Sequence, residues 1–247
     1  MAARRRLDAE LLRRELAPSR TAAQALIDAD RVFVNGAVAA KASRQVSPGD
    51  AVIVDGPPAR FVGRGAEKIE HALDHFDIDV MGLRLLDAGA STGGFTDSVL
   101  QRGAREVVAV DVGHGQLHER LRGDQRVVNL ERTNIRSIDQ TVVGGTVDGV
   151  VGDLSFISLR LVIAPVVAVC QPGGFMVLLV KPQFEAGRTE VSRGKGVITD
   201  SSIHDRVRTE IDTALVEAGC RVEGWTTSPI TGADGNVEFL VHAVTPR

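Results

Sequence analysis

From residue 65 onward, short apolar runs typical of β-strands alternate with segments typical of helices. The runs lie at residues 84–88, 106–111, 126–130, 147–153, 175–181, 221–227 and 237–243. Because parallel strands need crossover connections, usually helical, this alternation predicts an α/β fold, a doubly wound and mostly parallel sheet with helices on both faces. In such sheets, ligands bind beyond the carboxyl ends of the strands.

Charged residues end four of these otherwise apolar strands. They are Asp87, Asp111, Asp153 and Lys181. Lysine and aspartate are rarely buried without a partner, and the carboxyl ends of parallel strands meet at one edge of a sheet. We therefore expect a functional site at this edge.

The turn after the first strand, Asp87-Ala88-Gly89-Ala90-Ser91-Thr92-Gly93-Gly94-Phe95, is rich in glycine. A dinucleotide-binding fingerprint would need glycine where Ser91 stands, which disfavours a nicotinamide-dependent oxidoreductase. Asp87 would repel a pyrophosphate but would suit the cationic sulfonium and amino groups of S-adenosylmethionine. Asp111 can accept hydrogen bonds from both ribose hydroxyls of either cofactor. A turn that serves only as a tight connection is the alternative.

Residues 1–58 are predicted to form a small α+β domain, residues 59–64 a linker and residues 65–247 the α/β domain. The small domain begins with two short helices, the first of which leaves Arg13 and Arg14 for solvent or phosphate. A hairpin with the turn Asn35-Gly36 and a last strand at residues 51–54 follow.

The charge of the chain is unevenly distributed. Residues 1–64 carry 11 Lys and Arg against 7 Asp and Glu, whereas the remainder carries 18 against 25. A basic head on an acidic body indicates that the head binds a polyanion. Phe33 is the only aromatic residue among the first 60. This favours recognition of phosphates and RNA shape over base stacking.

Several functions are disfavoured by what the chain lacks. No apolar stretch approaches the roughly 18 residues of a membrane span, and the basic N-terminus is not followed by the apolar segment of a secretory signal. Cys170 and Cys220 lie too far apart in sequence for a CxxC motif, and the pairs His71/His75 and His114/His118 lack the glutamate of HExxH. We therefore expect a cytoplasmic, monomeric protein without a metal site.

Five segments resemble one known family. They are GRGAEKI (63–69), LLDAGASTGGFTD (85–97), DLSFISL (153–159), LVKPQFE (179–185) and GNVEF (235–239). Residues 3–41, ARRRLDAELLRRELAPSRTAAQALIDADRVFVNGAVAAK, resemble the S4 RNA-binding fold. Together these segments are similar to the TlyA family, whose Rossmann-like catalytic domain resembles the FtsJ-type ribose 2′-O-methyltransferases. The chain departs from the family pattern at Phe61 and Gly63, where the family commonly has Trp and Ser.

The resemblance implies an S-adenosylmethionine-dependent enzyme that methylates cytidine ribose 2′-hydroxyls in small- and large-subunit ribosomal RNA. The implied catalytic residues are Lys68, Asp153, Lys181 and Glu238. The expected cofactor contacts are Asp87, Gly89, Ala90, Ser91, Thr92, Gly93, Gly94, Phe95, Asp111, Asn134 and Asp153. The expected RNA contacts are Arg4, Arg6, Arg20, Lys41 and Arg64. Turn formation is the alternative for Asn134, and a solvated basic face is the alternative for each arginine.

The four implied catalytic residues suit methyl transfer to a hydroxyl. A ribose 2′-hydroxyl is a weak acid, so transfer needs a base within hydrogen-bond reach and in-line placement of the methyl carbon. Lys181 can be that base when neutral, a form that the charge of Lys68 favours and that Asp153 and Glu238 oppose. In the alternative, Lys181 only holds the hydroxyl in place.

Two further functions are weighed against this one. A non-enzymatic RNA-binding or ribosome-assembly factor would not need all four of these residues. A membrane-active haemolysin, a label that the family also carries, would need a membrane span or a long basic amphipathic helix.

Overall fold

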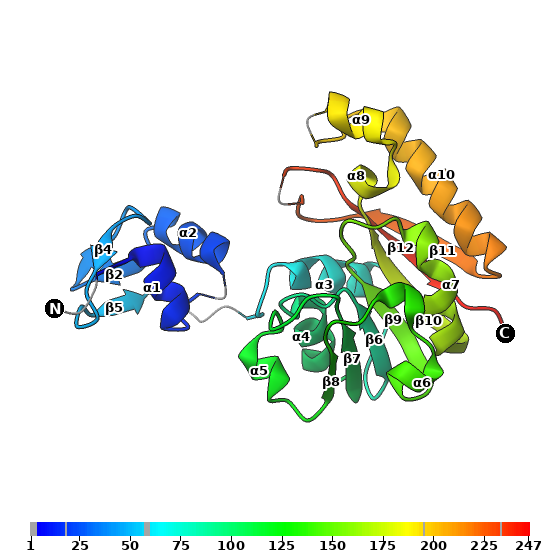
Figure 1. The fold of residues 1–247 in the computed structure, drawn as a ribbon, viewed down its shortest axis with the longest axis horizontal. Helices are drawn as coiled ribbons and strands as arrows, with labels where there is room; N and C mark the ends of the chain where they lie inside the picture. The colour runs from blue at the N-terminus through cyan, green and yellow to red at the C-terminus, as the bar shows by residue number, and fades with distance from the viewer. Residues whose placement is uncertain (1–3, 18, 57–59, 195, 233) are drawn as a thin grey trace. The chain divides into compact units, whose positions relative to one another are not determined.

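The computed structural model describes residues 4–17, 19–56, 60–194, 196–232 and 234–247. They fall into two compact units, Met1–Gly63 and Arg64–Arg247 (Figure 1). The expected domain boundary between residues 58 and 59 lies outside the described residues. Within the part of the chain that is described, no helix is both long and apolar enough to cross a membrane.

The first unit combines two helices, α1 (Leu7–Arg13) and α2 (Arg20–Asp28), with two small antiparallel sheets. One sheet has the order β3 (Ala37–Val38), β2 (Val32–Val34), β5 (Val52–Val54), and the other pairs β1 (Arg5–Arg6) with β4 (Gln45–Val46). Asn35 and Gly36 both have positive φ, as the predicted hairpin turn requires. Leu7, Leu11 and Ile27 are fully buried between the helices and the strands.

The second unit is built on a seven-stranded sheet (Figure 1). Its strands are β6 (Arg84–Ala88), β7 (Glu106–Val110), β8 (Val127–Leu130), β9 (Val147–Gly152), β10 (Cys170–Val180), β11 (Arg221–Thr227) and β12 (Phe239–Val244). Their order is β11-β12-β10-β9-β6-β7-β8, in which β12 runs antiparallel to both of its neighbours while the pairs from β10 to β8 are parallel. The predicted doubly wound, mostly parallel sheet is thereby confirmed.

Helices cover both faces of this sheet. They are α3 (Gly65–His75), α4 (Gly94–Gln101), α5 (Glu119–Arg122), α6 (Gln140–Val143), α7 (Ile163–Val169), α8 (Pro182–Glu185), α9 (Arg188–Arg193) and α10 (Ser201–Glu217), with 3-10 turns η1 (Ile135–Ser137) and η2 (Leu159–Leu161). Leu86 and Ala88 of β6 share a core with α6, α7 and α10. Asp87 points to the opposite face, where it meets Thr96 of α4, because successive strand residues alternate between faces.

The order of the strands places the site. The chain runs outward from β6 through β7 to β8 and then returns to β9 on the other side of β6. The carboxyl ends of β6 and β9 therefore lie at a switch point, where open α/β sheets bind their ligands. Because β12 is antiparallel, its first residue, Phe239, pairs with the last residue of β10, Val180. The start of β12 thus lies at the same edge.

Candidate active site

The four predicted catalytic residues come from four elements and meet at this edge. Asp153 follows the last residue of β9, and Lys181 follows the last residue of β10. Glu238 directly precedes β12, which begins at Phe239, two residues later than the predicted start at 237. Glu238 therefore lies just outside the strand that was predicted to contain it. Lys68 lies on the buried face of α3.

Each of the two lysines is paired with a carboxylate. The Lys68 ammonium donates to Glu238 Oε2 at 2.6 Å and lies 3.9 Å from Asp153 Oδ2. The Lys181 ammonium lies 2.5 Å from Asp153 Oδ1. Asp153 therefore stands between the two ammonium groups, and the four residues form one connected set, which we call the tetrad.

Three members of the tetrad are buried, and Asp153 is the most exposed. The side chains of Lys68, Glu238 and Lys181 are only 8%, 2% and 10% exposed, whereas Asp153 is 22% exposed. Removing one partner of a buried ion pair typically costs about 3–5 kcal/mol, because the other charge stays buried without compensation. The Lys68–Glu238 pair is thus a buried support for the tetrad, and Asp153 is the member of the tetrad most open to solvent.

A loop after β9 completes the surroundings of Lys181. The Lys181 ammonium donates to Ser155 Oγ at 2.6 Å. The next residue, Phe156, has φ +63° and a 90% exposed side chain. Its ring centroid lies 5.1 Å from that of Phe184, which follows Lys181 in α8. A bulky residue in the left-handed region costs about 1–3 kcal/mol, and such strain is typical of functional sites.

Ser155, Phe156 and Phe184 are not among the predicted site residues, although they lie in the segments that carry the family resemblance. The aromatic residues inside DLSFISL and LVKPQFE read as ordinary apolar positions, because nothing in the sequence distinguishes an exposed phenylalanine from a buried one. A positive φ at Phe156 is likewise invisible in sequence.

The glycine turn between β6 and α4 lies against the loop that begins at Asp153. Gly89 has φ +87°, and a Cβ at this position would lie 2.7 Å from the Asp153 carbonyl oxygen. Gly93 also has positive φ, and a Cβ there would collide with the side chain of Leu121. Ser91 adopts φ +48° and donates its backbone N–H to Asp111 Oδ2 at 2.8 Å. The turn therefore needs glycine for close approach as well as for its backbone conformation.

Asp87 is a fully buried carboxylate with one unsatisfied oxygen. Oδ2 accepts from the backbone N–H and the hydroxyl of Thr96, at 2.9 and 2.6 Å. Oδ1 is buried and has no hydrogen-bond partner among the described residues. Burial raises the pKa of Asp87 to about 7, and the negative charges of Asp153 and Asp111 act in the same direction. A cation beside Oδ1 would therefore be bound favourably.

These groups fit S-adenosylmethionine. Asp87 offers an uncompensated acceptor to a cationic group, and the absence of a side chain at Gly89 lets the turn pack closely against the Asp153 backbone. Asp111 holds its carboxylate at the end of β7 through bonds from Ser91 N and Gly113 N, at 2.8 and 2.7 Å. Each of its oxygens keeps a further lone pair for a ribose hydroxyl.

Two expected cofactor residues have local roles in this structure. The Phe95 ring is 3% exposed and lies beside Gly65 at the start of α3, so it packs α4 against α3. The Asn134 side chain accepts from the backbone N–H of Arg136 at 3.0 Å and so caps η1. This is the turn-forming alternative for Asn134. Ala90 and Thr92 lie in the turn, and Gly94 is the first residue of α4.

The expected RNA contacts Arg4, Arg6, Arg20, Lys41 and Arg64 are all exposed. Arg6 is ion-paired with its neighbour Asp8 at 2.9 Å but keeps nearly half of its side chain exposed. The first four belong to the Met1–Gly63 unit and Arg64 to the other.

The assignment of Arg14 to solvent or phosphate is wrong. Its guanidinium pairs with the buried Glu10 at 2.8 Å and donates to the backbone oxygens of Ser47, Pro48 and Asp50. Arg14 is therefore a structural residue that joins α1 to the turn between β4 and β5.

The histidine pairs take part in packing and polar contacts. The His71 and His75 rings stack with centroids 5.9 Å apart, and His71 Nε2 lies 2.9 Å from Thr226 Oγ1. His114 lies 2.6 Å from Glu131. Among the residues with described positions, no group of three or more His, Cys, Asp or Glu side chains is arranged to hold a metal ion.

The chain matches two known families. Residues 61–245 match the FtsJ-like methyltransferase family, and residues 5–52 match the S4 domain. It is 47% identical over 242 residues to the Mycobacterium tuberculosis protein named 16S/23S rRNA (cytidine-2′-O)-methyltransferase TlyA. The match covers 98% of this chain and 90% of that protein.

Two further relatives carry a different name. Hemolysin A of Brachyspira hyodysenteriae is 39% identical over 92% of this chain and 94% of its own length. A solved structure of a candidate hemolysin from Streptococcus thermophilus has a TM-score of 0.79 and 38% identity, and the match covers 100% of this chain and 90% of that one. On these matches, the chain belongs to the FtsJ-like methyltransferase family, as a TlyA-type member with an S4 domain, and S-adenosylmethionine is its methyl donor.

Proposed function

We propose that this protein methylates ribose 2′-hydroxyls of cytidines in ribosomal RNA, in both the small and the large subunit. The observation that carries the proposal is the tetrad, in which Asp153 bridges Lys68 and Lys181 beside the glycine turn. The name of the M. tuberculosis relative supports the substrate.

In this proposal Lys181, paired with Asp153, handles the 2′-hydroxyl. Bound S-adenosylmethionine supplies an electrophilic methyl group. Asp153 and Ser155 fix the Lys181 amino group at one point, 2.5 and 2.6 Å away. Lys181 in its neutral form accepts the hydroxyl proton, and its position holds the oxygen in line for attack. Lys68 adds positive charge that stabilises the developing alkoxide.

The base role of Lys181 has a direct test. Lys68→Ala removes a positive charge from the tetrad, and a nearby positive charge disfavours the protonated form of an amine. We expect the acidic limb of the pH–rate profile, where the rate rises as the base loses its proton, to move to higher pH in this variant. An unshifted profile would leave Lys181 with the orienting role alone.

We further propose that Phe156 and Phe184 stack on the target base. The Phe184 ring centroid lies 5.9 Å from the Lys181 ammonium and 5.1 Å from the Phe156 ring, and Phe156 is nearly fully exposed at a strained backbone position. Exposed aromatic side chains are the usual platforms for unstacked RNA bases. The tetrad would then receive a nucleotide whose base is splayed out of its helix.

Residues 1–58 are proposed to be the RNA-binding domain, joined by residues 59–64 to the catalytic residues 65–247. Arg4, Arg6, Arg20 and Lys41, with Arg64, would contact phosphates. Each lost phosphate contact should reduce the slope of log affinity against log salt concentration by about one. We expect the protein to act as a monomer on ribosomal subunits in the cytoplasm.

The test is transfer of labelled methyl groups to purified small and large subunits, followed by alkaline hydrolysis of the RNA. A 2′-O-methyl group blocks hydrolysis at its own position, so the label should appear in alkali-resistant dinucleotides that contain cytidine. Label on both subunits is the predicted result. Alkali-sensitive label would contradict ribose methylation, and no label on either subunit, with cofactor still bound, would favour a non-enzymatic RNA-binding factor.

A further inference from the structure

A buried glutamate links the segment that carries Lys181 to the loop that carries Asp153. Glu185 is the last residue of α8, four residues after Lys181, and only 6% of it is exposed. Its carboxylate accepts from Ser158 Oγ at 2.5 Å and from the backbone N–H of Leu159 at 2.7 Å. Both donors lie at the end of the loop that starts at Asp153.

That loop is fixed at both ends and strained in between. At its start, Asp153 N donates to the Ala88 carbonyl at 2.9 Å. At its end, Glu185 provides the two bonds from Ser158 and Leu159. Between these points lie Ser155, which accepts from Lys181, and Phe156 in its left-handed conformation. A strained conformation persists only when the surrounding structure holds it, and Glu185 is one of the two anchors.

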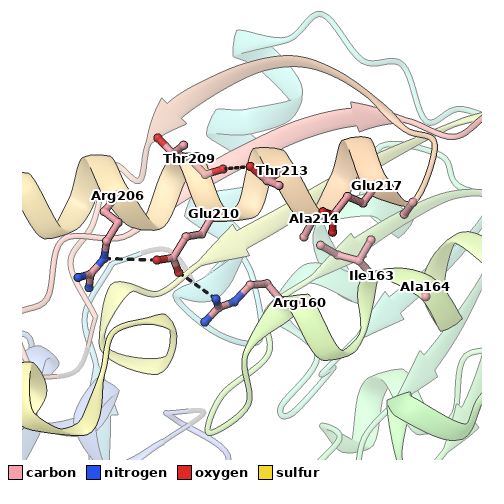
Figure 2. Close-up of a pocket in the computed structure, with 10 residues that line it drawn as sticks. Arg160, Ile163, Ala164, Arg206, Thr209, Glu210, Thr213, Ala214 and Glu217 are labelled. Carbon is pink, nitrogen blue, oxygen red and sulfur yellow. Dashed lines mark hydrogen bonds and ion pairs between the residues drawn. The ribbon is translucent and has the colours of Figure 1, made fainter.

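Arg160 supports the glutamate from the other side. Its Nη2 donates to the Glu185 carbonyl at 3.2 Å, and its Nε lies 3.6 Å from the Glu185 carboxylate. Its Nη1 lies 2.9 Å from Glu210 of α10, which also faces Arg206 (Figure 2). Arg160 thus offsets part of the cost of burying this carboxylate, whose pKa burial still raises, and it ties the end of the loop to a long helix.

We propose that Glu185 is a positioning residue for methyl transfer. It holds the Ser155–Phe156 turn against Lys181, so that the amino group of Lys181 and the aromatic platform keep their relative position. It acts through other residues and lies too deep to touch substrate. This inference rests on the proposed function for its kinetic consequence, but its structural part stands on the contacts of Glu185 alone.

The kinetic experiment compares Glu185→Ala, Glu185→Gln and the control Glu217→Ala, which removes an exposed carboxylate from α10. Cofactor binding by calorimetry counts the folded sites, and kcat is expressed per site. We expect kcat of Glu185→Ala to fall about tenfold or more, because small displacements of reacting groups cost large factors. The KM for cofactor should stay within about twofold, and Glu217→Ala should match wild type.

Rescue by glutamine separates positioning from a charge effect. The Glu185→Gln side chain keeps its length and an acceptor oxygen for Leu159 N, so kcat should return to within about threefold of wild type. A Glu185→Ala enzyme with kcat within about twofold of wild type would overturn the proposal. A Glu185→Gln enzyme as impaired as Glu185→Ala would also overturn it, since the charge would then be what matters.

Hydrogen exchange tests the anchor without any substrate. In Glu185→Ala and in Ser158→Ala, which removes one donor and no charge, amides 153–159 should exchange faster by about tenfold. Amides of β9 and β10 should keep their wild-type rates. Unchanged exchange in the loop of both variants would contradict the anchoring role. A wild-type enzyme that transfers no methyl group would refute the proposed function and leave this exchange result as an independent outcome.

Discussion

The buried carboxylate of Asp87 should give the ligand-free protein an unusual dependence on pH. Burial raises its pKa to about 7 from an ordinary value of 3.8. An acid whose pKa is higher in the folded state binds its proton more tightly there. Its contribution to stability is therefore greatest at low pH and is lost as the pH rises from 3.8 to 7.

The size of this effect follows from the two pKa values. Between pH 5 and pH 8, titration of Asp87 should lower the free energy of unfolding by about 2.5 kcal/mol. Asp87→Asn removes the titration and keeps an acceptor for the two Thr96 donors. The difference in free energy of unfolding between wild type and Asp87→Asn should therefore change by this amount between pH 5 and pH 8, while the titration of groups common to both proteins cancels.

Urea unfolding of wild type and Asp87→Asn at pH 5 and pH 8 measures this difference. Cofactor affinity gives a second measurement on the same proteins. If the cation of S-adenosylmethionine binds beside the ionised carboxylate, wild-type affinity at pH 5 should be about 100-fold below its value at pH 8, since roughly 1% of the groups are then ionised. Asp87→Asn should lack this dependence. Parallel pH curves for the two proteins would refute a perturbed, functional Asp87.

Three further substitutions test other parts of the structure. Gly89→Ala should weaken cofactor binding about tenfold or more and lower stability by about 2 kcal/mol or more, because its Cβ would meet the Asp153 carbonyl at 2.7 Å. The control Gly82→Ala, at similar φ with open space around it, isolates the backbone cost. Equal effects of the two substitutions in calorimetry and urea unfolding would show that close approach to Asp153 does not matter. Arg14→Ala should lower the stability of the isolated first unit by about 2 kcal/mol without changing the salt slope of RNA binding, and an altered slope would show a phosphate contact. Phe156→Ala should raise the KM for RNA about tenfold with no loss of thermal stability, and an unchanged KM would rule out the stacking role.

The sheet could be predicted from sequence because its signal is local. Each predicted strand is a short apolar run; all seven end within one residue of the observed carboxyl end, and six of the seven begin within two residues of the observed start. The exception is the start of β10. β10 begins at Cys170 rather than at 175, and its pairing with β9 shifts register between Cys170 and Phe175. The two-residue strands β1 and β4 carry too few residues for any periodicity.

The tetrad itself could not be predicted from spacing. Lys68 and Glu238 are 170 positions apart, and their contact depends on the antiparallel insertion of β12 beside β10. Only the order of five family-like segments indicated that they belong together. The error at Arg14 has the same cause, because the backbone oxygens that bind it lie more than 30 positions away.

The supporting contacts of the site were also hidden in sequence. Glu185 lay inside a recognised segment, but its partners Ser158 and Leu159 are on a different loop. The exposure and the positive φ of Phe156 depend on tertiary structure, which overrides local preference. Sequence therefore indicates which chemical groups are present, and the structure is needed to show which of them are held in place and by what.

The most direct test of the central claim is single-turnover methyl transfer by Lys181→Ala, with cofactor and RNA affinities measured on the same preparation. The account predicts that both affinities stay within about threefold of wild type while the transfer rate falls by about 10²–10⁴-fold, the range of a lost positioned base. A transfer rate within about tenfold of wild type, with binding intact, would show that the tetrad does not carry the reaction.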